Sequence, residues 1–292
     1  MNRSGRISVL TAALLLMVML GALLLPAAAF AQTTYDDGLS FGARATVEAD
    51  AKLAKGLHLM AHEQFRYYGD SEDILRFHTG IGLEYKVLPF LKVGAEYELI
   101  NRYKFDVDLN ANNWSIRHRG NFFLTGTLKT SGWQFGLKET LRLTHRPGDM
   151  NTLQAPRNVL ALKSKVSAKY LGWGKIVPFA GFEVRNSLND AAYKGTYNAS
   201  ADKNKDIYAN EEFLGYTHAY VNRYRIELGT TVKFDKRHAL EFYLLGDHYR
   251  DKSIDTNREG SSSWEKNGLV LKAIDWHVGN MITAGVGYKW EF

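Results

Sequence analysis

Apolar and polar residues alternate along most of the chain, and the stretch from Leu75 to Val87 shows this pattern most clearly. Every second residue there is Leu, Phe, Thr, Ile, Leu, Tyr or Val, whereas the residues between them are Arg, His, Gly, Gly, Glu and Lys. Successive side chains of a strand point to opposite faces of the sheet. A period of two therefore predicts a β-strand with one apolar face and one polar face.

Eleven stretches share this alternation, and the connections between them are of two kinds. The alternating stretches are 39–52, 57–68, 75–87, 91–103, 114–128, 133–145, 158–171, 178–185, 217–233, 238–249 and 281–292. Short connections lie near 54–56, 88–89, 130–132, 172–174 and 235–237, and long polar ones lie near 106–112, 147–157, 187–216 and 251–266. Short turns at one end and long loops at the other are typical of a transmembrane β-barrel.

A soluble β-sandwich or barrel would also show this alternation. The choice between a soluble fold and a transmembrane barrel therefore depends on which residues the polar face carries. That face is densely charged, with residues such as Arg44, Glu96 and Arg142, which suits a polar lumen behind an outer face that meets lipid. We therefore predict an all-β fold, a single antiparallel transmembrane β-barrel. Bacterial barrels have even strand numbers, so we expect about twelve strands, with ten as the alternative. Residues 268–278 are either a twelfth strand or an extension of the last one.

The first 31 residues predict a signal peptide, which leaves residues 32–292 as the barrel domain. Arg3 and Arg6 precede an apolar run over 9–25, and Ala29-Phe30-Ala31 is a small-x-small site, so we expect cleavage after Ala31. An uncleaved anchor is the alternative, because the run is long for a signal peptide. The chain has no cysteine, so this exported protein uses no disulfides.

The net charge is modest and argues against nucleic acid as a partner. The signal peptide holds two of the 37 basic residues and no acid, so the mature chain has 37 − 2 = 35 bases against 31 acids, a net charge of +4. The basic residues are interspersed with acids. Nucleic-acid-binding proteins usually gather them on one face.

The last residues, "GVGYKWEF", resemble the C-terminal strand of bacterial outer-membrane barrels, with Gly287, Trp290 and a terminal Phe292 in matching positions. In those families the strand is read by the barrel-assembly machinery. The resemblance thus implies an assembly signal at these three residues and a location in the outer membrane of a Gram-negative bacterium. It implies two partners, outer-membrane lipid and the assembly machinery, and says nothing of the oligomeric state.

Most of the mature chain also resembles an uncharacterised outer-membrane barrel family, a domain of unknown function. The resemblance rests on "NRYKF" at 101–105, "NRYRIELG" at 222–229, "FRYYGD" at 65–70 and "GLEYKV" at 82–87. In that family Arg residues alternate on the strands, and one strand carries Asn-Arg-Tyr-Arg. The resemblance brings no activity with it.

We find no convincing catalytic or metal-binding constellation. A barrel lipase needs a serine activated by a histidine, and no His-x-Ser tripeptide occurs. Asp247 and His248 are adjacent, so they point to opposite faces of their strand and cannot serve one lumen site. His58 and His62 share a face but lie roughly 13 Å apart along a strand, too far for one ion. We predict no cofactor and no metal site.

The inward-facing charges are the remaining candidate site. The predicted lumen charge cluster consists of Arg117, Arg119, Lys163, Lys165, Glu183, Arg185, Arg223, Arg225, Glu227 and Glu241. In one interpretation opposite charges pair across the lumen and close it. In the other, basic groups line a constriction that favours anions. Glu63, Asn101, Glu139 and Ser164 break the pattern because they fall on the lipid-facing phase, either as exceptions or through a β-bulge.

The sequence therefore favours a non-enzymatic envelope protein. It would be a structural barrel or a narrow, porin-like pore with a charge-lined lumen and outer loops that contact ligands. The alternative is an outer-membrane barrel enzyme of lipase or protease type that acts on lipid or peptide.

Overall fold

The computed structural model describes residues 33–69, 75–106, 111–148, 150–197, 208–256 and 271–292. The predicted signal peptide, with its cleavage site after Ala31, lies outside the described residues. None of the described residues forms a helix long and apolar enough to cross a membrane.

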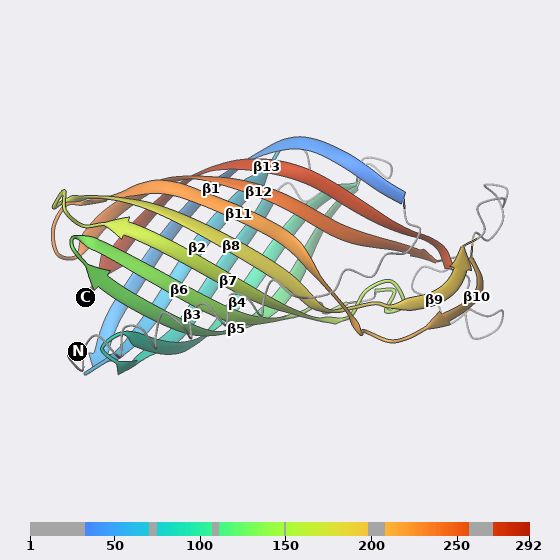
Figure 1. The fold of residues 1–292 in the computed structure, drawn as a ribbon, viewed down its shortest axis with the longest axis horizontal. Helices are drawn as coiled ribbons and strands as arrows, with labels where there is room; N and C mark the ends of the chain where they lie inside the picture. Colours follow the sequence, from blue (N-terminus) through green and yellow to red (C-terminus); the bar gives the residue numbers. More distant parts are fainter. Residues whose placement is uncertain (1–32, 70–74, 107–110, 149, 198–207, 257–270) are drawn as a thin grey trace, which may run out of the picture.

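Eleven strands form one closed barrel, so the predicted all-β barrel is confirmed (Figure 1). Around the barrel the order is β1-β2-β3-β4-β5-β6-β7-β8-β11-β12-β13, and β13 returns to β1. The strands are β1 (Thr33–Ala54), β2 (Leu57–Tyr68), β3 (Leu75–Leu88), β4 (Leu91–Asp106), β5 (Ala111–Thr130), β6 (Trp133–His145), β7 (Asn158–Tyr170), β8 (Ile176–Asp190), β11 (His218–Lys233), β12 (His238–Thr256) and β13 (Leu271–Glu291). Each of the eleven alternating stretches corresponds to one of these strands.

The barrel closes through a parallel pair, which the sequence did not predict. Neighbouring strands are otherwise antiparallel, but β1 and β13 run in the same direction, with Thr33 opposite Asp275 and Asp50 opposite Glu291. Each hairpin reverses the chain direction, so an odd number of strands brings the first and last strands into parallel alignment. The number is odd because residues 271–278 extend β13 instead of forming a twelfth strand.

The two ends of the barrel differ as the connection lengths predicted. At the turn end, tight connections join β1 to β2, β3 to β4, β5 to β6, β7 to β8, and β11 to β12. Gly56 and Gly132 have φ angles of 79° and 81° there, which a residue with a side chain rarely adopts. β1 begins at the opposite end, the loop end, and β13 finishes at the turn end (Figure 1).

The loop end carries a small cap that alternation alone did not reveal. Within the longest predicted loop, β9 (Tyr193–Tyr197) and β10 (Tyr208–Phe213) form a separate hairpin beyond the barrel (Figure 1). Tyr193 packs there in a cluster with Ile254 and Leu271 from the extended ends of β12 and β13. Burial raises the pKa of Tyr193 above its ordinary value, so its hydroxyl remains protonated and donates to the Leu153 carbonyl.

The two faces of the wall have the character that the sequence predicted. Large apolar side chains stand exposed on the outside; Ile81 is 55% exposed and Phe122 is 59% exposed. Several inward-facing acids are buried instead, and Glu98 and Glu183 are each 6% exposed. A soluble domain would bury its large apolar side chains, whereas this barrel presents them to its surroundings.

Aromatic residues gather at both ends of the outer wall. At the turn end, the Trp133 and Tyr170 rings lie 5.0 Å apart, and Trp290 packs on Phe292. Toward the loop end, Tyr103 packs on Trp114 at 5.1 Å. Two such girdles are the arrangement found in membrane barrels.

The residues that break the alternation are accommodated without a β-bulge. The registers of β2 with β3 and of β6 with β7 are continuous. Glu63 lies directly opposite Thr79 and accepts its hydroxyl hydrogen bond at 2.6 Å. Glu139 accepts one from Ser164, also at 2.6 Å. Both carboxylates thus find a hydrogen-bond donor on the adjacent strand.

The parallel seam can be tested by disulfide cross-linking, because the natural chain has no cysteine. Ala43 and Ala284 lie directly opposite each other across β1 and β13. We expect Ala43→Cys with Ala284→Cys to form a disulfide on oxidation, detected as a shift in gel mobility that reducing agent reverses. The control pair, Ala49→Cys with Ala284→Cys, should not cross-link, because Ala49 lies opposite Trp290. Cross-linking of the control pair alone would contradict the register.

Candidate functional site in the barrel lumen

Glu98 on β4 is the hub of a polar layer inside the barrel. Its carboxylate accepts hydrogen bonds from Arg119 at 2.9 Å and from Asn121 at 2.6 Å, and Nδ1 of His78 lies 3.1 Å away. Arg119 is the register neighbour of Glu98 on β5, so the strand pairing itself brings the two charges together. Arg142 extends the layer to β6 by donating to Asn121 at 3.1 Å.

A glycine gives His62 its position next to this hub. His62 on β2 and Glu98 on β4 both lie opposite Gly80 of the intervening strand β3. A methyl group on Gly80 would come within 2.1 Å of the His62 ring, so the ring occupies the space of the missing side chain. Nδ1 of His62 thereby lies 3.0 Å from Glu96.

His62, Glu96 and Glu98 are the kind of ligands that could hold a metal ion. One ligand atom from each lies within 4.8 Å of the others. However, Glu98 already accepts bonds from Arg119 and Asn121, and Glu96 accepts a bond from Asn121 at 3.0 Å. An ion would have to compete with these donors, because both carboxylates already accept hydrogen bonds from protein groups.

A second group of charges is centred on Arg225 of β11. Its guanidinium donates two hydrogen bonds to Asp247, at 2.7 and 3.0 Å, and it lies 3.9 Å from Glu183. Lys163 on β7 also pairs with Glu183, at 2.9 Å. The Asp247 side chain is fully shielded from solvent. A bidentate arginine–carboxylate pair is among the stronger and more directional protein interactions.

Nearer the turn end, Lys289 joins three strands. It lies 2.8 Å from Glu241 on β12 and 3.5 Å from Glu48 on β1. Lys289 therefore links the first strand to the last two and ties the parallel seam together from inside. Lys165 and Glu227 form a further ion pair between β7 and β11.

Most of the predicted lumen cluster is brought together by the structure. Eight members form ion pairs: Arg119, Lys163, Lys165, Glu183, Arg185, Arg225, Glu227 and Glu241. The other two share the inner face. Arg117 lies opposite Ile100, and Arg223 lies with its guanidinium 6.0 Å from the Tyr249 ring centre.

Ion pairing follows the wall of the barrel, whereas one interpretation of the sequence expected it to cross the lumen. Each of the pairs described above joins neighbouring strands or strands with one strand between them. Glu98, Glu183 and Asp247 are nevertheless buried. The side chains therefore form a layer of paired charges along the inner wall.

Several central residues were missing from the predicted cluster. Glu98 and Asp247 are the main acids of the layer, and His78 is 1% exposed within it. The alternation pattern singles out Asp247 only as the neighbour of His248, on the opposite face of the strand. The signal that could have identified these residues is the register between strands, which places Glu98 beside Arg119 and Asp247 beside Arg225.

Among the residues that the structure describes, the histidines form no catalytic pair with a serine or threonine. Within the described ranges, histidine ring nitrogens contact carboxylate, amide, ammonium and phenol groups, and none contacts a serine or threonine hydroxyl. His248 contacts Asn280 on the outer face at 3.1 Å, whereas Asp247 points inward. The predicted separation of these two neighbours is therefore confirmed.

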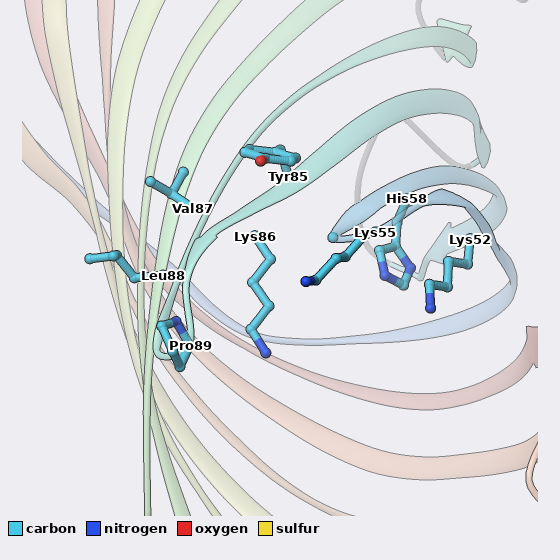
Figure 2. Close-up of a pocket in the computed structure, with 9 residues that line it drawn as sticks. Lys52, Lys55, His58, Tyr85, Lys86, Val87, Leu88 and Pro89 are labelled. Atoms are coloured by element: carbon cyan, nitrogen blue, oxygen red, sulfur yellow. The ribbon is translucent and has the colours of Figure 1, made fainter.

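A hollow at the turn end is lined by basic side chains. Figure 2 shows Lys52, Lys55, Lys86 and His58 around it, with Pro89 at its edge. His58 is held by Asp50, 2.6 Å from its Nδ1. His58 thus lies in this hollow, whereas His62 lies beside the polar layer.

The three residues of the predicted assembly signal lie at the end of the barrel wall. Trp290 belongs to β13, and Phe292 donates its backbone N–H to Asp50 at 2.8 Å. A methyl group on Gly287 would meet only the Cβ of Glu241, at 3.6 Å, so packing does not demand glycine there. The recognition role of these residues stays a prediction.

The Arg225–Asp247 pair should contribute strongly to stability. Asp247→Ala removes the bidentate partner and leaves Arg225 inside the layer, so we expect the free energy of unfolding to fall by about 3–5 kcal/mol. Urea unfolding of the protein in lipid vesicles would measure this. Arg225→Met combined with Asp247→Leu should recover most of the loss, because the unpaired charge is then gone.

The control for this experiment is Glu291→Ala, which removes an exposed carboxylate. That change should stay within about 0.5 kcal/mol of the natural protein. If Asp247→Ala were no more destabilising than Glu291→Ala, the layer would not be the stabilising element described here.

Comparison with known protein families gives a match. The model of a family described as "Protein of unknown function (DUF2490)" matches residues 42–258, which is most of the barrel. No curated protein matches the chain.

Proposed function

The chain belongs to DUF2490, a family whose description names no activity, and from the geometry of the lumen we propose that it is a non-enzymatic outer-membrane barrel with a nearly closed interior. One observation carries the proposal: large apolar side chains are exposed outside the closed wall, whereas charged side chains lie inside it, with Glu98, Glu183 and Asp247 buried. In a bilayer this arrangement places each kind of side chain in its favourable surroundings.

The outer membrane is the location that best fits the whole chain. The predicted export signal, the closed sheet and the aromatic girdles all support it. The proposed partners are outer-membrane lipid around the wall and the assembly machinery, which would read Gly287, Trp290 and Phe292. Bacterial single-chain barrels have even strand numbers, but an odd-numbered barrel is known in the mitochondrial outer membrane, so eleven strands are compatible with this environment.

The polar layer supports a structural role over that of an open pore. Barrels of eight strands are filled by side chains, whereas porins of sixteen to eighteen strands leave an aqueous channel. Eleven strands lie nearer the filled class. The buried Glu98, Glu183 and Asp247 show how closely the charged groups pack. The loop-end cap is then the part of the molecule that contacts ligands outside the cell.

Membrane insertion should depend on the outer face far more than on the inner one. Leu83 is exposed on the outside, and its neighbour Glu84 points inward to Lys92 at 2.6 Å. Leu83→Arg puts a charge against lipid at a cost of about 2–4 kcal/mol near the midplane, so we expect a large loss of folded barrel. Glu84→Gln should have little effect. The fraction of heat-modifiable protein in the membrane measures both, and equal losses would mean that the faces are reversed.

Planar-bilayer conductance tests the closed lumen. The natural protein should conduct little, whereas Arg225→Ser combined with Asp247→Ser removes bulk from the layer and should give a clear increase in current. Asp235→Ser with Arg237→Ser is the matched control, because it changes the same residue types in the exposed turn between β11 and β12. Steady, anion-selective conductance by the natural protein would overturn the closed interpretation.

A further inference from the structure

Two histidines stand next to each other on the outer face of the wall. His118 on β5 lies directly opposite His145 on β6, and the centres of their rings are 6.3 Å apart. Both follow the phase of exposed apolar residues, because Ile116 and Phe122 share the face of His118, and Leu143 shares the face of His145. We call His118 and His145 the histidine pair. It is created by the register between two strands.

Hydrogen bonds on either side of the histidine pair determine where the lone pairs lie. Nδ1 of His145 lies 2.8 Å from the side-chain oxygen of Asn158 on β7, and Nδ1 of His118 lies 2.6 Å from the hydroxyl of Tyr97 on β4. An amide oxygen can only accept, so Nδ1 of His145 donates and the lone pair of this ring is on Nε2. The Tyr97 hydroxyl can accept from His118 in the same way. Among the residues that the structure describes, no group bonds Nε2 of either ring.

The two Nε2 atoms face each other between β5 and β6. The two nitrogens of an imidazole point to opposite sides of the ring, and each Nδ1 is turned away from the other histidine, toward β4 in one case and toward β7 in the other. With the ring centres 6.3 Å apart, the Nε2 atoms come within roughly 4 Å of each other, about twice the length of a zinc–imidazole bond. One ion can therefore contact both rings with little movement of the side chains.

We propose that the histidine pair binds one divalent transition-metal ion of the kind that prefers imidazole, such as Zn²⁺ or Cu²⁺. Tyr97 and Asn158 are positioning residues, because their hydrogen bonds to Nδ1 hold the rings as groups around metal-bound histidines usually do. Two protein nitrogens leave further coordination positions to water or to an oxygen of another molecule.

The location of the histidine pair makes it independent of the structural role proposed above. β6 ends at His145 and β7 begins at Asn158, so the pair lies at the loop-end edge of this part of the wall. An ion reaches it from that side without passing through the lumen. The pair also differs from His62, Glu96 and Glu98 in the lumen, whose carboxylates already accept hydrogen bonds from protein donors.

Zinc titration of the full-length protein, purified in detergent without an affinity tag, tests the proposal. Isothermal titration calorimetry of the natural protein should show a site for one Zn²⁺ per chain. His118→Asn and His145→Asn should each weaken this site by about tenfold or more, because each removes one of its two nitrogen ligands. The double variant should be little weaker than either single one. Mg²⁺, which prefers oxygen ligands, should give no such binding.

His248→Asn is the matched control for these variants. His248 also lies on the outer face and contacts an amide oxygen, that of Asn280, at 3.1 Å, but the ring beside it is Tyr224 and not a second histidine. This variant should bind Zn²⁺ as the natural protein does. If His118→Asn and His145→Asn titrate like His248→Asn, the proposal is wrong.

Substitutions of Asn158 test its positioning role. Asn158→Leu removes the acceptor for Nδ1 of His145 and should weaken Zn²⁺ binding by about tenfold. Asn158→Asp keeps an oxygen at the same place and should retain most of the affinity. Equal affinities of the natural protein and Asn158→Leu would show that Asn158 does not position the ring.

The natural protein supplies a test that needs no variant, whereas folding of each variant is checked by heat-modifiable gel migration. Diethyl pyrocarbonate modifies free imidazole nitrogens, and mass spectrometry locates the modified residues. Zn²⁺ should protect His118 and His145 and leave His248 reactive. Protection of all three histidines alike, or of none, would overturn the assignment of the site to the histidine pair.

Discussion

Closure of the hydrogen-bonded sheet is the constraint on which the rest of the structure depends. Once β13 pairs with β1, no strand edge remains in the barrel, so every wall strand has partners on both sides. Closure also divides the side chains of the wall into two sets, one on the inner face and one on the outer face. A residue on the inner phase is confined to the lumen, and a residue on the outer phase faces the surroundings.

Confinement explains the chemistry of the interior. Charges that cannot reach bulk water have to be paired or hydrogen-bonded nearby. The register between paired strands places their partners at fixed spacing. Register brings Glu98 to Arg119 and Asp247 to Arg225. Glycine provides room where a ring must lie against the wall, as Gly80 does for His62.

The sequence predicted the wall well because alternation is a local property. Each strand's phase can be read from its own residues, so the division into an outer apolar and an inner charged face was correct. The strand number was harder. Alternation over 268–278 cannot distinguish a new strand from a longer one, and the observed eleven strands lie between the ten and twelve that an even number allows.

The ion pairs were less predictable than the face on which each side chain lies. They depend on the register between strands that can be distant in sequence. Lys163, Glu183 and Arg225 were expected to share the lumen, and they do. Alternation alone did not indicate that Glu98 is a hub. The β9–β10 hairpin was missed for a related reason, since its packing depends on the distant ends of β12 and β13.

Spin-label accessibility along β4 tests the central claim most directly. Single cysteines from Val93 to Arg102 would carry a nitroxide in lipid vesicles, and accessibility to oxygen and to a water-soluble nickel complex would be measured at each position. The account predicts high oxygen accessibility at Ala95, Tyr97 and Leu99, and low accessibility to both reagents at Glu96, Glu98 and Ile100. High nickel accessibility at those three inward positions would reveal a water-filled lumen and contradict the closed polar layer.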